Sequence, residues 1–136
     1  MDIGKQKVNA EAIEQGEWIE NIPEAGDLRL KLRGRTCADY RQMQQRLISA
    51  LPRNVRFQSP LPLETSDRIN LTCLVEVCMI DWEGVLDNGQ PVKFSKELAL
   101  QIMKDPAQID FQEAVYRALE MVGRGEKAVN EAIAKN

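Results

Sequence analysis

The segment at residues 16–34, whose second half alternates strictly in residue type, constrains the fold of this 136-residue chain more than any other feature. In its second half, "LRLKLR" places Leu28, Leu30 and Leu32 on one side of an extended chain and basic residues on the other. Residues 23–26, just before this run, are of types that favour a turn. The pattern therefore predicts a β-hairpin over about residues 16–34. A hairpin is barely stable by itself in water. Its leucine face must therefore be covered, and the next helix along the chain is the obvious candidate.

Apolar residues at helical spacing follow the hairpin and stop at Pro52, which predicts a helix over about residues 37–51. Thr36 and Asp39 stand at its start with the spacing of a capping box. Residues 53–63 contain two further prolines and no helical period. We expect an extended connector there.

The run from residue 69 to residue 80 fits two structures. Its apolar residues alternate as in a strand, while Ile69, Cys73 and Val77 also form a helical stripe. The run is longer than most strands, and the residues before it often begin helices. A helix over about residues 66–82 is therefore favoured, and a strand remains the alternative.

Two more apolar stripes predict helices over about residues 95–104 and 109–123. These elements predict an α+β, predominantly helical fold, in which an N-terminal β-hairpin packs on a bundle of about four to five helices. The length suits a single domain spanning residues 1–136.

The last eleven residues, "EKAVNEAIAKN", carry only a thin apolar stripe. Val129 and Ile133 are its largest members, too few to hold the segment firmly on its own subunit. We expect a mobile C-terminal helix over about residues 126–135, with Val129 and Ile133 as partner-binding residues.

The stretch "DWEGVLDNGQPVKFSKE", residues 81–97, reads as a structural joint between two helices. A glycine breaks the helical period, an Asn-Gly pair predicts a tight turn, and a serine stands where the next helix needs an N-cap. We expect the tryptophan to pack beneath the turn against the phenylalanine. The joint residues are Trp82, Gly84, Asn88, Gly89, Phe94 and Ser95.

The chain contains no histidine, so Ser-His or Cys-His nucleophile pairs and imidazole metal ligands are excluded. Asp81, Glu83 and Asp87 are hard-oxygen ligands that could gather a divalent cation. Their spacing is not that of an EF-hand loop, so the structural interpretation is favoured. No catalytic, metal or cofactor-binding residue is predicted, and a carboxylate-based metal-dependent enzyme is only a minor alternative.

Charge and composition narrow the class of partner. A net charge of −3 argues against nucleic acid, and no apolar run reaches the roughly 18 residues needed to cross a membrane. The first 15 residues lack the apolar core of a signal peptide, so we expect an intracellular protein. The three cysteines lack paired C-x-x-C spacing, so we expect them to be reduced and mostly buried.

Several stretches resemble one known family. They are "GEWIENIPEAGDLRLKLRG", "ADYRQMQQRL", "IDWEGVLDNGQPVKFSKELALQIM" and the closing "KN". The most particular element is the Trp-Glu-Gly-Val turn at residues 82–85, followed by Asn-Gly, Pro91 and "FS" at the head of a helix. Over most of its length the chain resembles the tail assembly chaperones of long-tailed bacteriophages.

This resemblance implies a non-enzymatic protein that binds the tape measure protein, recruits tail tube protein and forms homo-oligomers. It implies action in the host cytoplasm and absence from the mature virion. Neither a small-molecule substrate nor a cofactor is implied. A regulatory or structural adaptor of another phage or bacterial system is the main alternative.

Overall fold

The computed structural model describes residues 1–125 of the chain. Its α-helices are α1 (Ala10–Gln15), α2 (Ala38–Ser49), α3 (Arg53–Arg56), α4 (Leu63–Cys73), α5 (Lys96–Lys104) and α6 (Ile109–Met121). Its strands are β1 (Glu17–Ile19), β2 (Arg29–Leu32), β3 (Met79–Glu83), β4 (Leu86–Asp87) and β5 (Gln90–Pro91). A π-helical turn, η1 (Leu74–Cys78), and a 3-10 turn, η2 (Pro106–Gln108), complete the elements. The predicted α+β, helix-dominated class is confirmed. The helix expected at 126–135, with Val129 and Ile133, lies outside the described residues.

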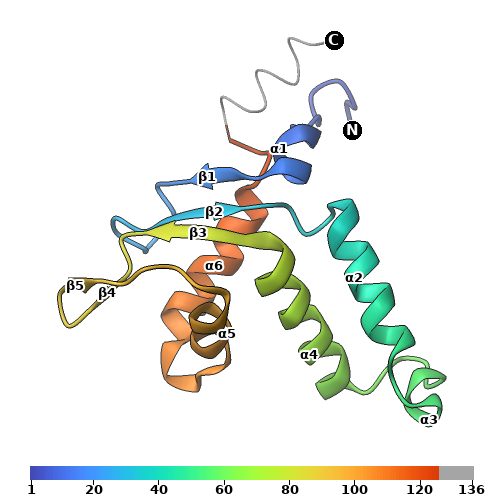
Figure 1. The fold of residues 1–136 in the computed structure, drawn as a ribbon. Coiled ribbons are helices and arrows are strands. Elements are labelled where there is room, and N and C mark those ends of the chain that lie inside the picture. The colour runs from blue at the N-terminus through green and yellow to red at the C-terminus, as the bar shows by residue number, and fades with distance from the viewer. Residues whose placement is uncertain (126–136) are drawn as a thin grey trace.

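Three antiparallel strands form the main sheet in the order β1-β2-β3 (Figure 1). β1 and β2 are the two strands of the predicted hairpin, with Trp18 opposite Lys31. β3 comes from much later in the chain and places Trp82 opposite Leu30. β4 and β5 form a separate small hairpin beyond the end of β3.

The leucine face of β2 is buried in the core, as the alternation predicts. Leu30 and Leu32 have no exposed surface and belong to one apolar cluster with residues of η1 and α6, among them Val115 and Ala118. The expectation that the next helix covers this face is wrong. α2 has no fully buried residue and packs against α4, while α6 packs on β2 from the other end of the chain.

The predicted helix over residues 66–82 is wrong at its C-terminal end. α4 ends at Cys73, the π turn η1 continues the helical path to Cys78, and the chain then enters β3. The helical stripe and the strand alternation are therefore both real, and they follow one another. The joint at residues 81–97 accordingly connects a strand, a small hairpin and a helix, not two helices.

Two distant groups stabilise this change from helix to strand. The open edge of β2 supplies backbone partners to β3. The ammonium group of Lys96 donates hydrogen bonds to the carbonyl oxygens of Val75 and Glu76, each at 2.9 Å, and to that of Met79. A helix end leaves carbonyl groups without intrahelical partners, and a lysine can satisfy them.

The start of α2 is not the predicted capping box of Thr36 and Asp39. The Ala38 N–H instead donates to the carboxylate of Glu14 in α1, at 3.1 and 3.2 Å from its two oxygens. Asp39 forms an ion pair with Arg33 at 2.8 Å. A residue from another element therefore caps the helix.

The connector over residues 53–63 is not extended throughout, because α3 occupies its first four positions. Pro52 stands at the N-cap, where a proline is tolerated since the first turn of a helix lacks intrahelical N–H partners. The Arg56 guanidinium donates to the carbonyl of Ser49 at 3.1 Å and so ties α3 to the end of α2.

α2 and α4 run side by side in opposite directions and extend away from the sheet, with α3 at their far end (Figure 1). We call α2, α3 and α4 the arm. α5 and α6 form the other helical part of the molecule. A hollow opens between the arm and α6.

Candidate protein-binding cleft

Trp82 occupies the centre of the joint and is only 4% exposed. Its indole Nε1 donates to the carbonyl of Val92 at 2.7 Å. Phe94 and Phe111 pack edge-on against the indole, with ring centroids 5.0 and 5.8 Å away. The residue therefore links β3 to the segment between β5 and α5 and to α6.

The turns of the joint need residues that tolerate a positive φ. Gly84 has φ +80°, and a Cβ there would lie 2.6 Å from the carbonyl oxygen of Asp27. Asn88 and Gly89, with φ of 49° and 81°, form the two-residue turn between β4 and β5. Ser95 Oγ accepts from the N–H of Leu98 at 3.0 Å and caps α5.

The three carboxylates weighed as metal ligands have separate roles. Glu83 forms an ion pair with Arg29, and Asp81 accepts from the N–H of Trp82 at 2.8 Å. Asp87 lies on the small hairpin. Within residues 1–125, no group of three or more acidic or cysteine side chains is placed to hold a metal ion.

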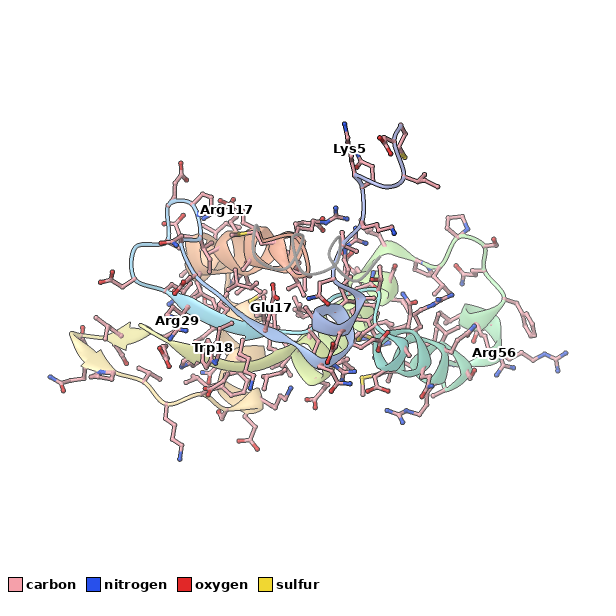
Figure 2. The ribbon with its side chains drawn as sticks, turned by 90° about the horizontal axis from the view of Figure 1, so that it is seen from above. Lys5, Glu17, Trp18, Arg29, Arg56 and Arg117 are labelled. Carbon is pink, nitrogen blue, oxygen red and sulfur yellow. The ribbon has the colours of Figure 1, made fainter. Side chains whose placement is uncertain are left out.

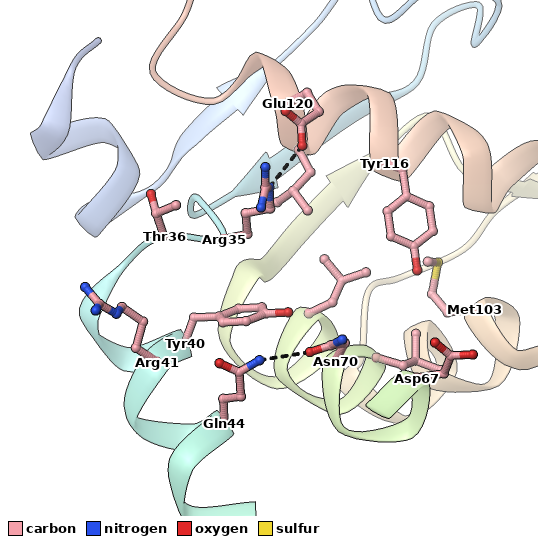
Figure 3. A pocket seen from close by; sticks show the side chains of 13 residues that line it. Arg35, Thr36, Tyr40, Arg41, Gln44, Asp67, Asn70, Met103, Tyr116 and Glu120 are labelled. Atoms are coloured by element: carbon pink, nitrogen blue, oxygen red, sulfur yellow. Dashed lines mark hydrogen bonds and ion pairs between the residues drawn. The ribbon is translucent and has the colours of Figure 1, made fainter. Parts of the chain in front are cut away.

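A cleft of about 960 Å³ lies between the arm and α6 (Figure 3). Its buried floor is apolar and comes from η1, α5 and α6, with Leu74, Met103 and Leu119 as members. Its walls are polar and come from α2, α4, α6 and the segment before α2. The wall residues include Arg35, Thr36, Tyr40, Arg41, Gln44, Asp67, Asn70, Tyr116 and Glu120.

Two polar contacts fix the walls. Gln44 Nε2 donates to Asn70 Oδ1 at 3.1 Å, which joins α2 to α4 within the arm. Arg35 Nε pairs with Glu120 Oε1 at 3.0 Å, which joins the start of the arm to α6. Both contacts are exposed and contribute little stability individually. Of the two, only the Arg35–Glu120 pair connects the start of the arm to α6.

Tyrosines face the cleft from both sides. Burial raises the pKa of Tyr40 to about 12, so its phenol is neutral and can donate a hydrogen bond. Tyr116 on α6 is 51% exposed. The charged lining residues are two basic and two acidic side chains, so the cleft carries no strong charge of either sign. Tyrosine is enriched at protein interfaces because its ring is apolar and its hydroxyl stays hydrated.

The three cysteines are free and buried, as predicted. Burial is also the main cause that raises the pKa of Cys78 to about 12. A thiol with such a pKa stays protonated at neutral pH and is a poor nucleophile.

The sequence patterns did not single out Asp67, Asn70 or Tyr116. Tyr116 is exposed and lies beside Val115, a fully buried member of the apolar stripe of α6. An aromatic residue outside such a stripe is the only local signal of the cleft. The expected partner-binding residues Val129 and Ile133 lie outside the part of the chain that the structure describes.

Comparison with known proteins places the chain in a family. Among the described residues, no helix is long and apolar enough to span a membrane. The searches of curated proteins and of solved structures found no match. The family model described as YdaY prophage protein matches residues 35–136, a region that begins just before α2 and includes every residue lining the cleft. Because this match extends over most of the chain, the protein belongs to the YdaY prophage protein family.

Proposed function

We propose that this prophage protein is a non-enzymatic tail assembly chaperone. It binds the tape measure protein, acts as a homo-oligomer and promotes assembly of the tail tube. The family supports a phage origin, and the resemblance of the Trp-Glu-Gly-Val turn and its flanks supports the tail chaperone class. The cleft between the arm and α6 is the observation that carries the proposal.

The cleft suits a helical client. Amphipathic helices bind in grooves that have an apolar floor and polar walls, and their apolar side chains anchor at helical spacing. Here Leu74 and Leu119 supply the floor, while Tyr40 and Tyr116 flank it from the arm and from α6. A chaperone of a long filament must accept many related segments, and a cleft with balanced charge discriminates little between them.

The proposed site is tested by co-expression with the tape measure protein of the same prophage. Tyr116→Arg places a charged, longer side chain at the cleft, and the exposed position keeps the fold intact. Gln45→Arg adds the same residue on an exposed face of α2 that does not line the cleft, and is the matched control. We expect the wild-type protein and the control to keep the tape measure protein in the supernatant and to co-purify with it, and Tyr116→Arg to fail in both.

The outcomes separate the function from the site. If the tape measure protein behaves alike with and without the wild-type protein, the chaperone proposal is refuted. If Tyr116→Arg acts as well as the control, the function stands and the binding surface lies elsewhere. Mass spectrometry of purified virions tests the proposal that the chaperone acts in the host cytoplasm and is absent from the mature particle.

A further inference from the structure

A second hollow, of about 450 Å³, lies beside the β4–β5 hairpin. Most of its lining residues are apolar, with Leu86, Val92, Ile102 and Phe111 among them. Leu86 is 60% exposed. The charged residues that line this hollow are all acidic, namely Glu24, Asp87 and Asp110. We call it the acidic groove.

The far end of the arm has the opposite chemistry. Phe57, at the end of α3, is 69% exposed, and Leu63, the first residue of α4, is 75% exposed. The guanidinium carbons of Arg53 and Arg56 lie 5.7 and 5.1 Å from the Phe57 ring centroid. Among the described residues, neither arginine forms an ion pair. We call Arg53, Arg56 and Phe57 the arm tip.

The two surfaces lie at opposite ends of the molecule. Figure 2 shows Arg56 at one end and the yellow β4–β5 hairpin at the other, and Figure 1 agrees. One copy therefore cannot bring its own tip into its own groove. Exposed apolar patches mark protein-binding surfaces, where aromatic residues and arginine are enriched.

We propose that the arm tip of one copy docks into the acidic groove of a second copy. The Phe57 ring enters the apolar hollow, and Arg53 and Arg56 face the carboxylates at its edge. The charges are complementary, and no lining charge of the groove repels the arginines. A buried aromatic anchor surrounded by charge pairs is a common arrangement at the centre of an interface.

Such a contact joins two different patches, so each added copy leaves one tip and one groove free. Heterologous contacts of this kind build rings or open filaments and do not stop at a dimer. The inference rests on the proposed function, because it supplies the surface for self-association of the chaperone. Its test needs no client.

Two variants isolate the two halves of the contact. The tip variant carries Phe57→Ala and Arg53→Glu, and the groove variant carries Leu86→Ala and Asp87→Lys. All four positions are exposed, so we expect the melting temperature to stay at the wild-type value. Lys5→Glu, on an exposed residue away from the tip and the groove, controls for the change in charge.

Light scattering coupled to size exclusion, over a concentration series of purified protein, gives the masses. We expect the mass of the wild-type protein and of Lys5→Glu to rise with concentration, and added salt to reduce it. Each double variant loses one half of the central contact. We therefore expect it to associate only at a protein concentration more than about tenfold higher than the wild type needs. An equal mixture of the two should form a dimer and nothing larger, because only one intact tip and one intact groove remain.

Three results would overturn the interface. They are a wild-type protein that stays monomeric over the series, a tip variant that associates as the wild type does, and a mixture that forms no dimer. If a double variant melts early, Arg53→Ala and Asp87→Ala repeat the test with smaller changes. Client solubilisation by a monomeric wild-type protein would leave the proposed binding of the tape measure protein in place while removing both the homo-oligomer and this interface.

Discussion

Replacement of Trp82 by alanine tests whether the joint holds the sheet and helices together. Removal of a buried aromatic side chain costs about 3 to 5 kcal/mol of unfolding free energy, through lost apolar contact and the cavity left behind. The edge-on contacts to Phe94 and Phe111 and the hydrogen bond to Val92 place Trp82 toward the upper end of that range. Domains of this size are stabilised by only about 5 to 15 kcal/mol.

Trp82→Phe separates the ring from the indole N–H. A phenyl ring keeps part of the aromatic packing but leaves the carbonyl of Val92 without its donor, which costs about 1 to 3 kcal/mol. We expect its stability to lie between those of the wild type and of Trp82→Ala. Trp18→Ala is the control, because Trp18 is half-buried under the Arg29 guanidinium and is no member of the core cluster.

Urea unfolding followed by far-ultraviolet circular dichroism gives the three free energies without relying on tryptophan fluorescence. The reasoning is refuted if Trp82→Ala unfolds at the wild-type urea concentration. That result, combined with loss of partner binding, would move Trp82 from the core to an interface.

Three further perturbations have defined outcomes. Lys96→Met should lower the melting temperature, with a loss of about 2 to 3 kcal/mol, because three carbonyl groups lose a charged donor, whereas Lys93→Met should not. Ser95→Ala should cost about 1 kcal/mol in urea unfolding by uncapping α5. Burial raises the pKa of Cys78 from 9.0 to about 12, so the native state holds the proton more tightly. The contribution of this thiol to stability should be fully present below pH 9 and be lost as the pH rises from 9 to about 12. Urea unfolding of Cys78→Ala over this pH range should show a shallower fall.

Local periodicity was sufficient to predict an element that buries one face and exposes the other. The alternation around Leu30 has period two and one buried face, so the strand β2 could be predicted from it. The element that covers that face could not. α6 lies near the other end of the described chain, and its packing on β2 depends on how every intervening connection turns.

The change from helix to strand at Met79 could not be predicted locally either. The sequence around Met79 carries both a helical and a strand periodicity. Which structure forms depends on the edge of β2 and on the ammonium group of Lys96. The cleft depends in the same way on the angle between the arm and α6. Its contact between Arg35 and Glu120 joins residues 85 positions apart, so no sequence window contains both.

The direct passage from α4 through η1 into β3 restricts where this chain can change length. No loop separates the helix from the strand, so one residue inserted within residues 74–78 would shift the register of β3. In a strand, such a shift exchanges the buried and exposed faces, which would bring Trp82 to the surface and Asp81 into the core. Insertions at residues 57–62 or at the β4–β5 turn change no buried register. Relatives of different length should therefore differ at these two places and keep the passage unchanged.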